Sequence, residues 1–125
     1  MTAAAALAGA QKLGPLASRY VDVARLPWQK TRWAGIECKI LLDDKESGLK
    51  TLLKRWAPGA QLPLHEHVRI EQTYVLEGSL VDAEGEATTG NFVWRPAGST
   101  HVATAPNGAL LLAFFLAPNL FFDEG

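Results

Sequence analysis

Residues 59–78 read Gly-Ala-Gln-Leu-Pro-Leu-His-Glu-His-Val-Arg-Ile-Glu-Gln-Thr-Tyr-Val-Leu-Glu-Gly, and residues 90–101 read Gly-Asn-Phe-Val-Trp-Arg-Pro-Ala-Gly-Ser-Thr-His. Together these glycine-bounded stretches contain His65, His67 and His101, which are all of the histidines in the chain. Side chains on a β-strand alternate between two faces, so a His-x-His pair on a strand places both imidazoles on one face. This pairing makes residues 59–78 the most specific pattern in the sequence.

A carboxylate follows the paired histidines. The short spacer at residues 68–70 can turn the chain, so that Glu71 begins a neighbouring strand beside them. Three neutral imidazoles and one carboxylate suit a divalent transition metal such as iron, manganese, nickel, zinc or copper. Glu71 has an alternative role, because a site of three histidines leaves the carboxylate free to orient a ligand or accept a proton. We predict one metal ion per chain, held by His65, His67, Glu71 and His101.

The two stretches resemble the paired sequence motifs of the cupin superfamily. The first motif, G(X)5HXH(X)3,4E(X)6G, is matched at every spacing by Gly59, His65, His67, Glu71 and Gly78. The second, G(X)5PXG(X)2H(X)3N, is matched by Gly90, Pro96, Gly98 and His101, although Ala105 replaces its final asparagine. The resemblance implies an all-β fold, the double-stranded β-helix or jelly-roll barrel, with the metal inside one mouth.

The composition is that of one globular domain. The chain has 125 residues, of which 48% are hydrophobic and 20% charged, and its formal net charge is -1. We therefore expect neither nucleic acid nor a membrane as a partner, because there is no long basic run and no apolar run of about 18 residues. The single cysteine, Cys38, fits a reducing compartment and hence the cytoplasm, and we expect it to be a small buried residue of a strand.

Short β-rich runs separated by turn residues predict an all-β sandwich or barrel independently of the resemblance. The alanine-rich residues 1–18 lack the charged start of a signal peptide and are interpreted as a mobile or loosely packed arm, followed by a domain at residues 19–125. The final run is apolar on both faces, which is typical of a strand covered on both sides. The expected strands are 20–23, 33–42, 49–56, 73–76, 79–82, 92–94, 101–104 and 109–116.

Candidate pocket residues follow from strand parity. Thr73 shares the face of Glu71, and Ala103 shares that of His101, where a small side chain leaves room near the metal. Phe92 and Trp94 share one strand face and are candidates to line the barrel. Arg69 lies in the turn between the ligands, where it either reaches over the mouth towards an anionic substrate or is simply solvated. The other tryptophans, Trp28, Trp33 and Trp56, are expected to pack in the core.

Within the superfamily, residues 75–85 followed by Gly90 resemble the compact central segment of ChrR-like cupins. That subgroup includes a zinc-binding anti-sigma domain and is similar to dioxygenases that cleave β-diketones and hydroxyacetophenones. The resemblance implies a small non-haem dioxygenase acting on a ketone or diketone with dioxygen, with Fe(II) as the expected metal and zinc, nickel or manganese as alternatives. In this reading Glu71 is a metal ligand or a catalytic base.

Two other functions stay open. A non-catalytic metal- or ligand-binding cupin of the sensor type is the main alternative, and an isomerase that uses a base instead of redox chemistry is a third. We also expect a homodimer, because cupins are commonly dimeric and because the apolar run at residues 110–116 leaves surface to cover. The competing interpretation is that residues 1–18 fold back over that surface.

Overall fold

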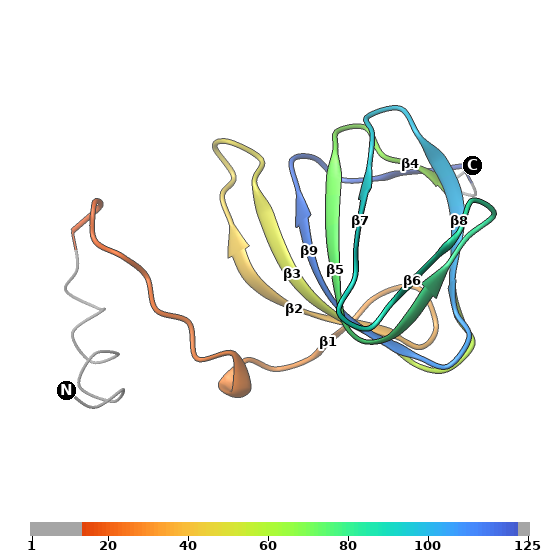
Figure 1. Ribbon diagram of the computed structural model, residues 1–125. Helices are drawn as coiled ribbons and strands as arrows, with labels where there is room; N and C mark the ends of the chain where they lie inside the picture. Colours follow the sequence, from red (N-terminus) through yellow and green to blue (C-terminus); the bar gives the residue numbers. More distant parts are fainter. Residues whose placement is uncertain (1–13, 123–125) are drawn as a thin grey trace.

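The computed structural model describes residues 14–122, which form β-strands that pair only antiparallel and curl into a barrel (Figure 1). One short 3-10 helix, η1 (Val23–Arg25), precedes them, and the described part of the chain has no α-helix. The predicted all-β class is confirmed. The strands are β1 (Gln29–Lys30), β2 (Ile36–Asp43), β3 (Lys50–Trp56), β4 (Ala60–Glu66), β5 (Glu71–Val81), β6 (Glu86–Thr88), β7 (Phe92–Arg95), β8 (Thr100–Ala105), β9 (Ala109–Phe115) and β10 (Leu120–Phe121).

Strand β5 joins the two halves of the barrel. The hydrogen-bonded order is β1-β2-β3-β9-β5-β8-β4-β10, with β6 and β7 also paired to β5. The first residues of β5 pair with β7, whereas its last residues pair with β6 and β8. A register shift between Val75 and Glu77 lets this long strand bend as it passes from one half to the other.

Two of the expected strand assignments are wrong. Residues 20–22 are irregular and lead into η1, because the run there is too short to pair and its side chains are exposed. The strands expected at 73–76 and 79–82 are one continuous strand, since Glu77 and Gly78 pair with β9 instead of forming a turn, and the bulge in β5 lies between Val75 and Glu77. The remaining predicted strands overlap β2, β3, β7, β8 and β9.

Gly78 sits at the bend of β5 with a backbone φ of +79°. L-residues with a side chain rarely adopt this left-handed conformation. The strand also passes so close to the turn before β9 that a Cβ at position 78 would collide with the carbonyl oxygen of Gly108. Because the added Cβ would meet main-chain atoms, no side-chain rotation could relieve the collision, so the position requires glycine.

Replacing Gly78 by alanine is expected to lower the free energy of unfolding by more than about 2 kcal/mol, since strained φ and a backbone collision add together. Gly90→Ala is the matched control, because Gly90 has a φ of +83° and open space around its Cβ position. It isolates the conformational cost, at about 1 kcal/mol. Urea denaturation of both variants measures the difference, and equal losses would contradict the collision argument.

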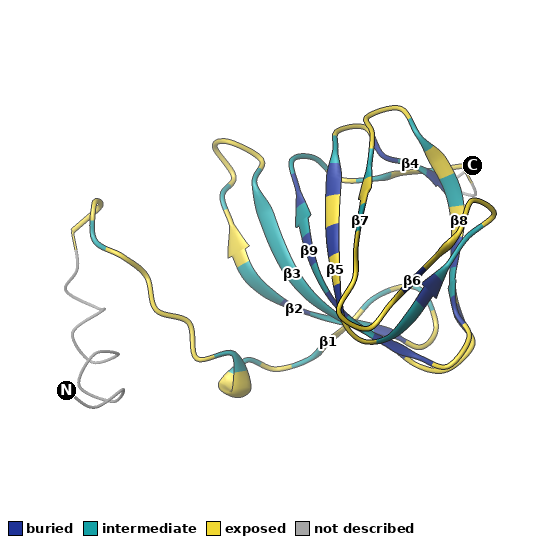
Figure 2. Ribbon diagram, in the orientation of Figure 1, coloured by how far each residue is buried: buried dark blue, intermediate teal, exposed yellow. Residues whose placement is uncertain are grey.

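The barrel interior is apolar at one end and polar at the other. The buried core residues come from seven strands, β2 to β6, β8 and β9, and Figure 2 shows the buried segments of β4, β5, β8 and β9. Along β9 the inward residues are buried and the outward residues Leu110, Leu112 and Phe114 are half-buried. The prediction that both faces of this strand are covered is therefore met only in part. Its outer face adjoins exposed apolar side chains on β5 and β7, namely Tyr74, Leu76, Phe92 and Trp94.

Residues 14–22 run away from the barrel (Figure 1), and Leu16 and Tyr20 are largely exposed. Most of the predicted arm, residues 1–13, lies outside the described part of the chain. The first anchor is Val23, whose carbonyl oxygen accepts a hydrogen bond of 2.8 Å from Lys39 Nζ on β2. Within residues 14–122 there is no helix with the length and hydropathy required to cross a membrane.

Candidate metal centre

A bulge in β4 turns both paired histidines into the barrel. Ala60 and Leu62 point inward, and strict alternation would then send position 65 outward. The register of β4 against β8 shifts between Leu62 and His65, so the extra residue in this bulge, next to Pro63, reverses the phase. His65 and His67 are each only 1% exposed as a result. The prediction that they share one face is confirmed.

The two histidine-bearing stretches interlock through their backbones. His67 lies just after β4, and its N–H donates to the carbonyl of Ser99 at 2.9 Å, while its own carbonyl accepts from the N–H of Gly98 at 2.7 Å. His65 and His101 are direct cross-strand partners on β4 and β8. The turn that contains Gly98 therefore fixes the distance between the first two histidines and the third.

Each imidazole has an oxygen beside its Nδ1 atom. His65 Nδ1 lies 2.8 Å from the Pro63 carbonyl oxygen, His67 Nδ1 lies 2.7 Å from Glu71 Oε2, and His101 Nδ1 lies 2.9 Å from Asp82 Oδ2. The contacts of His65 and His101 are hydrogen bonds in which the oxygen accepts, so these two rings carry the proton on Nδ1, whereas His67 Nδ1 and Glu71 Oε2 lie close together without hydrogen-bond geometry. The neutral ring then presents the lone pair of Nε2 as its free donor to a metal.

The three rings converge on one point inside the barrel. Ligand atoms of His65, His67 and His101 all lie within 4.8 Å of one another, and the Nε2 atoms of His67 and His101 are 2.9 Å apart. Two lone pairs that face each other at this distance repel unless a cation or a proton lies between them. The three histidines are thus positioned to bind a metal ion, and their nitrogen donors fit a first-row divalent ion.

Burial disfavours the protonated form of two of these rings, those of His65 and His101. It lowers the pKa of His65 to about 4, helped by the charges of His101 and His67 and opposed by the Pro63 and Glu71 oxygens. Burial also lowers the pKa of His101, against the effect of Asp82. Unprotonated imidazole is the form that binds metal, so the site is ready at neutral pH.

Glu71 stands behind His67 instead of joining the three nitrogens. Its Oε2 contacts His67 Nδ1, and its Oε1 accepts a hydrogen bond of 3.2 Å from Thr73 Oγ1. Burial raises the pKa of this carboxyl, but the His67 contact, the charge of Lys54 and the Thr73 hydroxyl together lower it below its ordinary value. Of the two roles that the sequence left open, this contact favours the one in which Glu71 orients a ligand.

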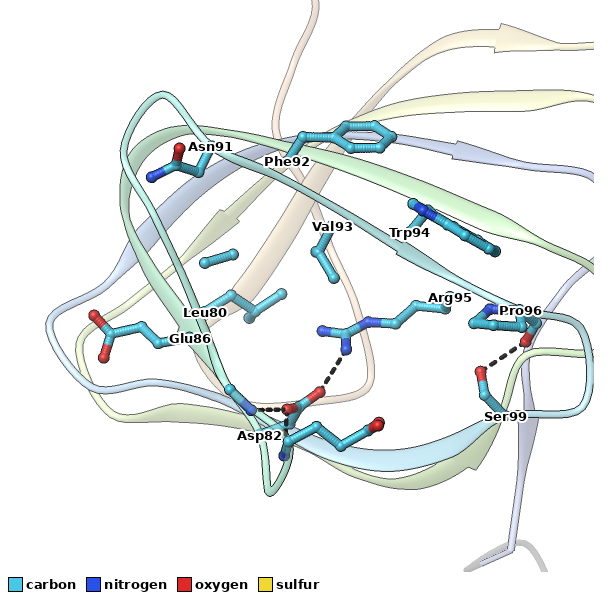
Figure 3. Close-up of a pocket in the computed structure, with 13 residues that line it drawn as sticks. Leu80, Asp82, Glu86, Asn91, Phe92, Val93, Trp94, Arg95, Pro96 and Ser99 are labelled. Atoms are coloured by element: carbon cyan, nitrogen blue, oxygen red, sulfur yellow. Dashed lines mark hydrogen bonds and ion pairs between the residues drawn. The ribbon is translucent and has the colours of Figure 1, made fainter.

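Asp82 gives His101 the same kind of support. Its Oδ2 accepts from His101 Nδ1 and from Arg95, whose Nη1 lies 2.5 Å away, and its side chain is only 2% exposed. Figure 3 shows Arg95 reaching from β7 to Asp82 at the end of β5. Burial raises the pKa of Asp82, but His101, Arg95 and the backbone N–H groups of Glu84 and Gly85 together lower it. The sequence pattern contains no signal for this contact.

Removal of the Asp82 carboxylate is expected to weaken metal binding by about ten- to hundredfold, the usual loss for a group that orients a metal-binding histidine. We expect this of Asp82→Ala, and a smaller loss for Asp82→Asn, whose amide oxygen still accepts from His101. Glu84→Ala, an exposed neighbour on the same hairpin, is the control. Competition for zinc against a coloured chelator measures each affinity. An unchanged affinity in Asp82→Ala would show that His101 needs no support.

The predicted pocket residues divide between two surfaces. Thr73 and Ala103 line the small chamber around the histidines, which has a volume of about 20 Å³. Phe92 and Trp94 do not line it, because the inward residues of β7 are Val93 and Arg95 and the two aromatic rings lie on the other side of the strand (Figure 3). Their side chains are half exposed, so their expected place inside the barrel is wrong. Arg69 is an exposed residue of the turn, as in the solvated interpretation.

Two residues of β3 also line the chamber although no motif pointed to them. Lys54 and Trp56 face the histidines from across the barrel, and Trp56 is only 3% exposed. Burial lowers the pKa of Lys54, and the charges of Glu71 and Cys38 oppose this effect. Trp56 was expected to pack in the core, and only the closed barrel shows that Lys54 and Trp56 both face the histidines.

An apolar hollow of about 320 Å³ adjoins the chamber and shares Lys54, Leu62 and Asn119 with it. Phe121 of β10 closes one side, with its ring centre 5.0 Å from that of His65 and 4.2 Å from that of Trp33. The hollow therefore provides apolar space next to the chamber. Its other lining residues are Thr31, Ile36, Cys38, Leu52, Phe115 and Pro118.

The family model of the ChrR Cupin-like domain matches residues 16–118. This span covers most of the sequence, so the chain belongs to the ChrR-like cupins. The predicted relationship to cupins and the predicted jelly-roll barrel are both confirmed. A search of the curated proteins finds no match.

Solved structures of other cupins share the fold. A candidate acetylacetone dioxygenase from Methylibium petroleiphilum superposes with a TM-score of 0.81 at 20% identity, over 90% of this chain and 85% of that one. An acetylacetone dioxygenase from Acinetobacter johnsonii gives 0.80 at 18% identity, over 90% and 83%. A polyketide cyclase from Streptomyces resistomycificus gives 0.68 at 20% identity, over 85% and 86%. At these identities the likeness shows the fold, and that fold accommodates more than one chemistry.

Proposed function

We propose that the protein is a metal-dependent dioxygenase that cleaves a small ketone, β-diketone or hydroxyacetophenone-like substrate, with Fe(II) as its metal. The observation that carries the proposal is the cluster of three histidine nitrogens beside an apolar hollow. The fold likeness to two proteins named for acetylacetone dioxygenase activity adds support. Fe(II), when bound, supplies the redox chemistry with dioxygen.

The chain's own residues bind, orient and exclude water. His65, His67 and His101 would hold the ion through their ring nitrogens, and the oxygens of Pro63, Glu71 and Asp82 lie behind the three rings and orient them. Glu71 is the candidate proton acceptor, because it is ionised, buried and adjacent to the cluster. The apolar walls of the hollow remove water from a bound substrate, which strengthens its electrostatic contacts with the site.

Oxygen consumption tests this function. The Fe(II)-loaded protein is expected to take up dioxygen in a substrate-dependent manner with at least one member of a panel of β-diketones and hydroxyacetophenones. The same protein carrying His101→Ala, treated identically with Fe(II), serves as the control for reactions of free iron. No substrate-dependent uptake across the panel would count against a dioxygenase.

A non-catalytic, metal-holding cupin is the second candidate, and the small chamber favours it. With a volume of about 20 Å³, the space between the histidines has room for an ion and little else. In this case zinc would be the natural metal, and the polar groups would keep the ion closed off from water. Metal analysis of protein purified without added metal, with water exchange at the bound ion, separates the two: tightly held zinc without exchangeable water supports this candidate, and iron with exchangeable water supports the enzyme.

We propose further that two copies of the chain associate through the outer face of β9, β5 and β7. Phe92, Tyr74 and Leu112 are cross-strand neighbours there, and Trp94 extends the same apolar surface. An exposed apolar face of this kind is typical of protein–protein contact. The opposite view, a face covered by residues 1–18, finds no support in residues 14–18, which run away from the barrel.

The dimer is expected to survive removal of residues 1–18 and to dissociate when Trp94 is replaced by glutamate, because a charge at the centre of an apolar contact must be desolvated. Light scattering at micromolar concentration on the full chain, on a chain that starts at Arg19, and on Trp94→Glu gives the masses. Val102→Glu, an exposed site on β8, is the control. Monomers for both the full and the shortened chain would rule the dimer out.

A further inference from the structure

Two side chains of β3, Lys54 and Trp56, bring hydrogen-bond donors to the histidine chamber. Trp56 Nε1 is buried without a hydrogen-bond partner. Lys54 Nζ lies 5.5 Å from the ring centre of Trp56 and 5.5 Å from that of Phe115, and within residues 14–122 it makes no hydrogen bond or ion pair. Both donors line the chamber from β3. A buried donor without a partner, such as Trp56 Nε1, is rare, because it forfeits a hydrogen bond that it had in water.

The charges around the chamber favour an anion. Lys54 and Arg95 are basic and Glu71 and Asp82 are acidic, so the ionised side chains around the chamber contribute two charges of each sign. These four charges cancel, so a divalent ion on the histidines leaves the site with an excess of two positive charges. A negatively charged ligand reduces this excess, whereas a neutral ligand does not.

The adjoining hollow sets the shape of that ligand. The chamber is too small for an organic molecule beside a metal ion, but Lys54 belongs to the walls of both the chamber and the hollow of about 320 Å³. The rest of the hollow is mainly aliphatic and aromatic, including Trp33, Leu52 and Phe121. A molecule that fills it would therefore have an apolar body and direct its polar end at Lys54.

We propose that Lys54 and Trp56 bind the anionic oxygen, carboxylate or enolate, of a small organic molecule whose apolar body occupies the hollow between β2, β3 and β10. Lys54 supplies the charge and Trp56 supplies a directed N–H. The inference deepens the proposed function, on which it rests in taking this anion as the molecule that reacts beside the metal. It assigns selectivity for charge to β3, on the side of the barrel opposite the metal-binding histidines.

Benzoate and benzamide test the proposal, because they have the same shape and differ in charge. Calorimetric titration of the zinc-loaded protein measures their binding without turnover, since zinc is not redox active. We expect tighter binding of benzoate than of benzamide. Lys54→Met should weaken benzoate binding by about ten- to hundredfold, the range for a hydrogen bond to a charged group, and leave benzamide binding within about threefold. Lys50→Met, on the same strand outside both cavities, should behave like the unaltered protein.

Trp56→Phe provides a second arm should Lys54→Met fail to fold, because it keeps the ring and removes only the N–H. A loss of about threefold to tenfold in benzoate affinity is expected. Each protein is first confirmed to hold one zinc ion per chain. Equal affinity for benzoate and benzamide in the unaltered protein, or an undiminished preference for benzoate in either variant, would overturn the proposal. Failure of the dioxygenase assay would leave these binding results unchanged, so the two proposals fail separately.

Discussion

Substitution of His101 by alanine is expected to reduce bound metal from about one ion per chain to less than about a tenth of that. The site relies on three nitrogen donors that are held in place before the metal arrives, and the loss of one removes both a ligand and the partner that faces His65 across β4 and β8. A two-histidine remnant can still bind weakly. Equilibrium dialysis against a metal buffer, with metal counted by mass spectrometry, gives the occupancy.

Val102→Ala is the control for this substitution, since Val102 is the next residue of β8 and points out of the barrel. It should keep full occupancy. Circular dichroism of the metal-free proteins checks that both remain folded. The assignment is refuted if the double variant His65→Ala, His101→Ala binds one metal per chain with unchanged affinity.

Acidification is expected to release the metal only at a pH below the ordinary pKa of histidine. Protons compete with metal for the histidine nitrogens, but burial places the pKa of His65 near 4 and lowers that of His101 as well. Occupancy should therefore persist below pH 6.5, the ordinary pKa of histidine, and fall as the pH approaches about 4. A pH titration of metal content measures the midpoint, and complete release above pH 6.5 would contradict the burial argument.

The metal-free protein should lose stability over the same range. The unfolded chain protonates His65 near pH 6.5, whereas the folded chain does so only near pH 4, so between these values the unfolded state binds more protons. The free energy of unfolding then decreases as the pH falls, by on the order of 2 kcal/mol for this residue after allowance for screening by water. Below that window the ionised Glu71 and Asp82, whose pKa values are lowered in the fold, protonate and remove further stability. The metal-free His65→Gln variant should show a shallower decline between pH 6.5 and 4.

Several features of the site were predictable because they depend on the order of residues along one strand or turn. The spacing of His65 and His67 predicts that their rings share a face, and the glycine at position 98 predicts the tight turn that brings His101 back. Thr73 and Ala103 fall inside for the same reason, since alternation carries through an unbroken strand. The all-β class likewise follows from short alternating runs between turn residues.

Alternation is insufficient where strands contain bulges or where both faces are apolar. Pro63 marks the bulge that restores an inward direction to His65, and β5 continues through Glu77 and Gly78 with a bulge between Val75 and Glu77, where a turn between two strands was expected. At β7 the outward residues Phe92 and Trp94 are more apolar than the inward Arg95, so hydrophobicity alone chose the wrong face. Register against a partner strand settles such cases, and register depends on residues far away in the sequence.

The sequence by itself determined the class of fold and the three histidines, because both are written in local spacing. Only the tertiary structure decided the contacts behind and opposite these histidines. Asp82 supports His101 from 19 positions away, and Lys54 and Trp56 come from a strand that does not adjoin β4 or β8. Closure of the barrel brings these residues together, and no periodicity in the chain encodes which inward side chain will meet which. The physical reason is that a strand's own pattern specifies its face, whereas its partners across the barrel are set by the curvature and register of the whole sheet.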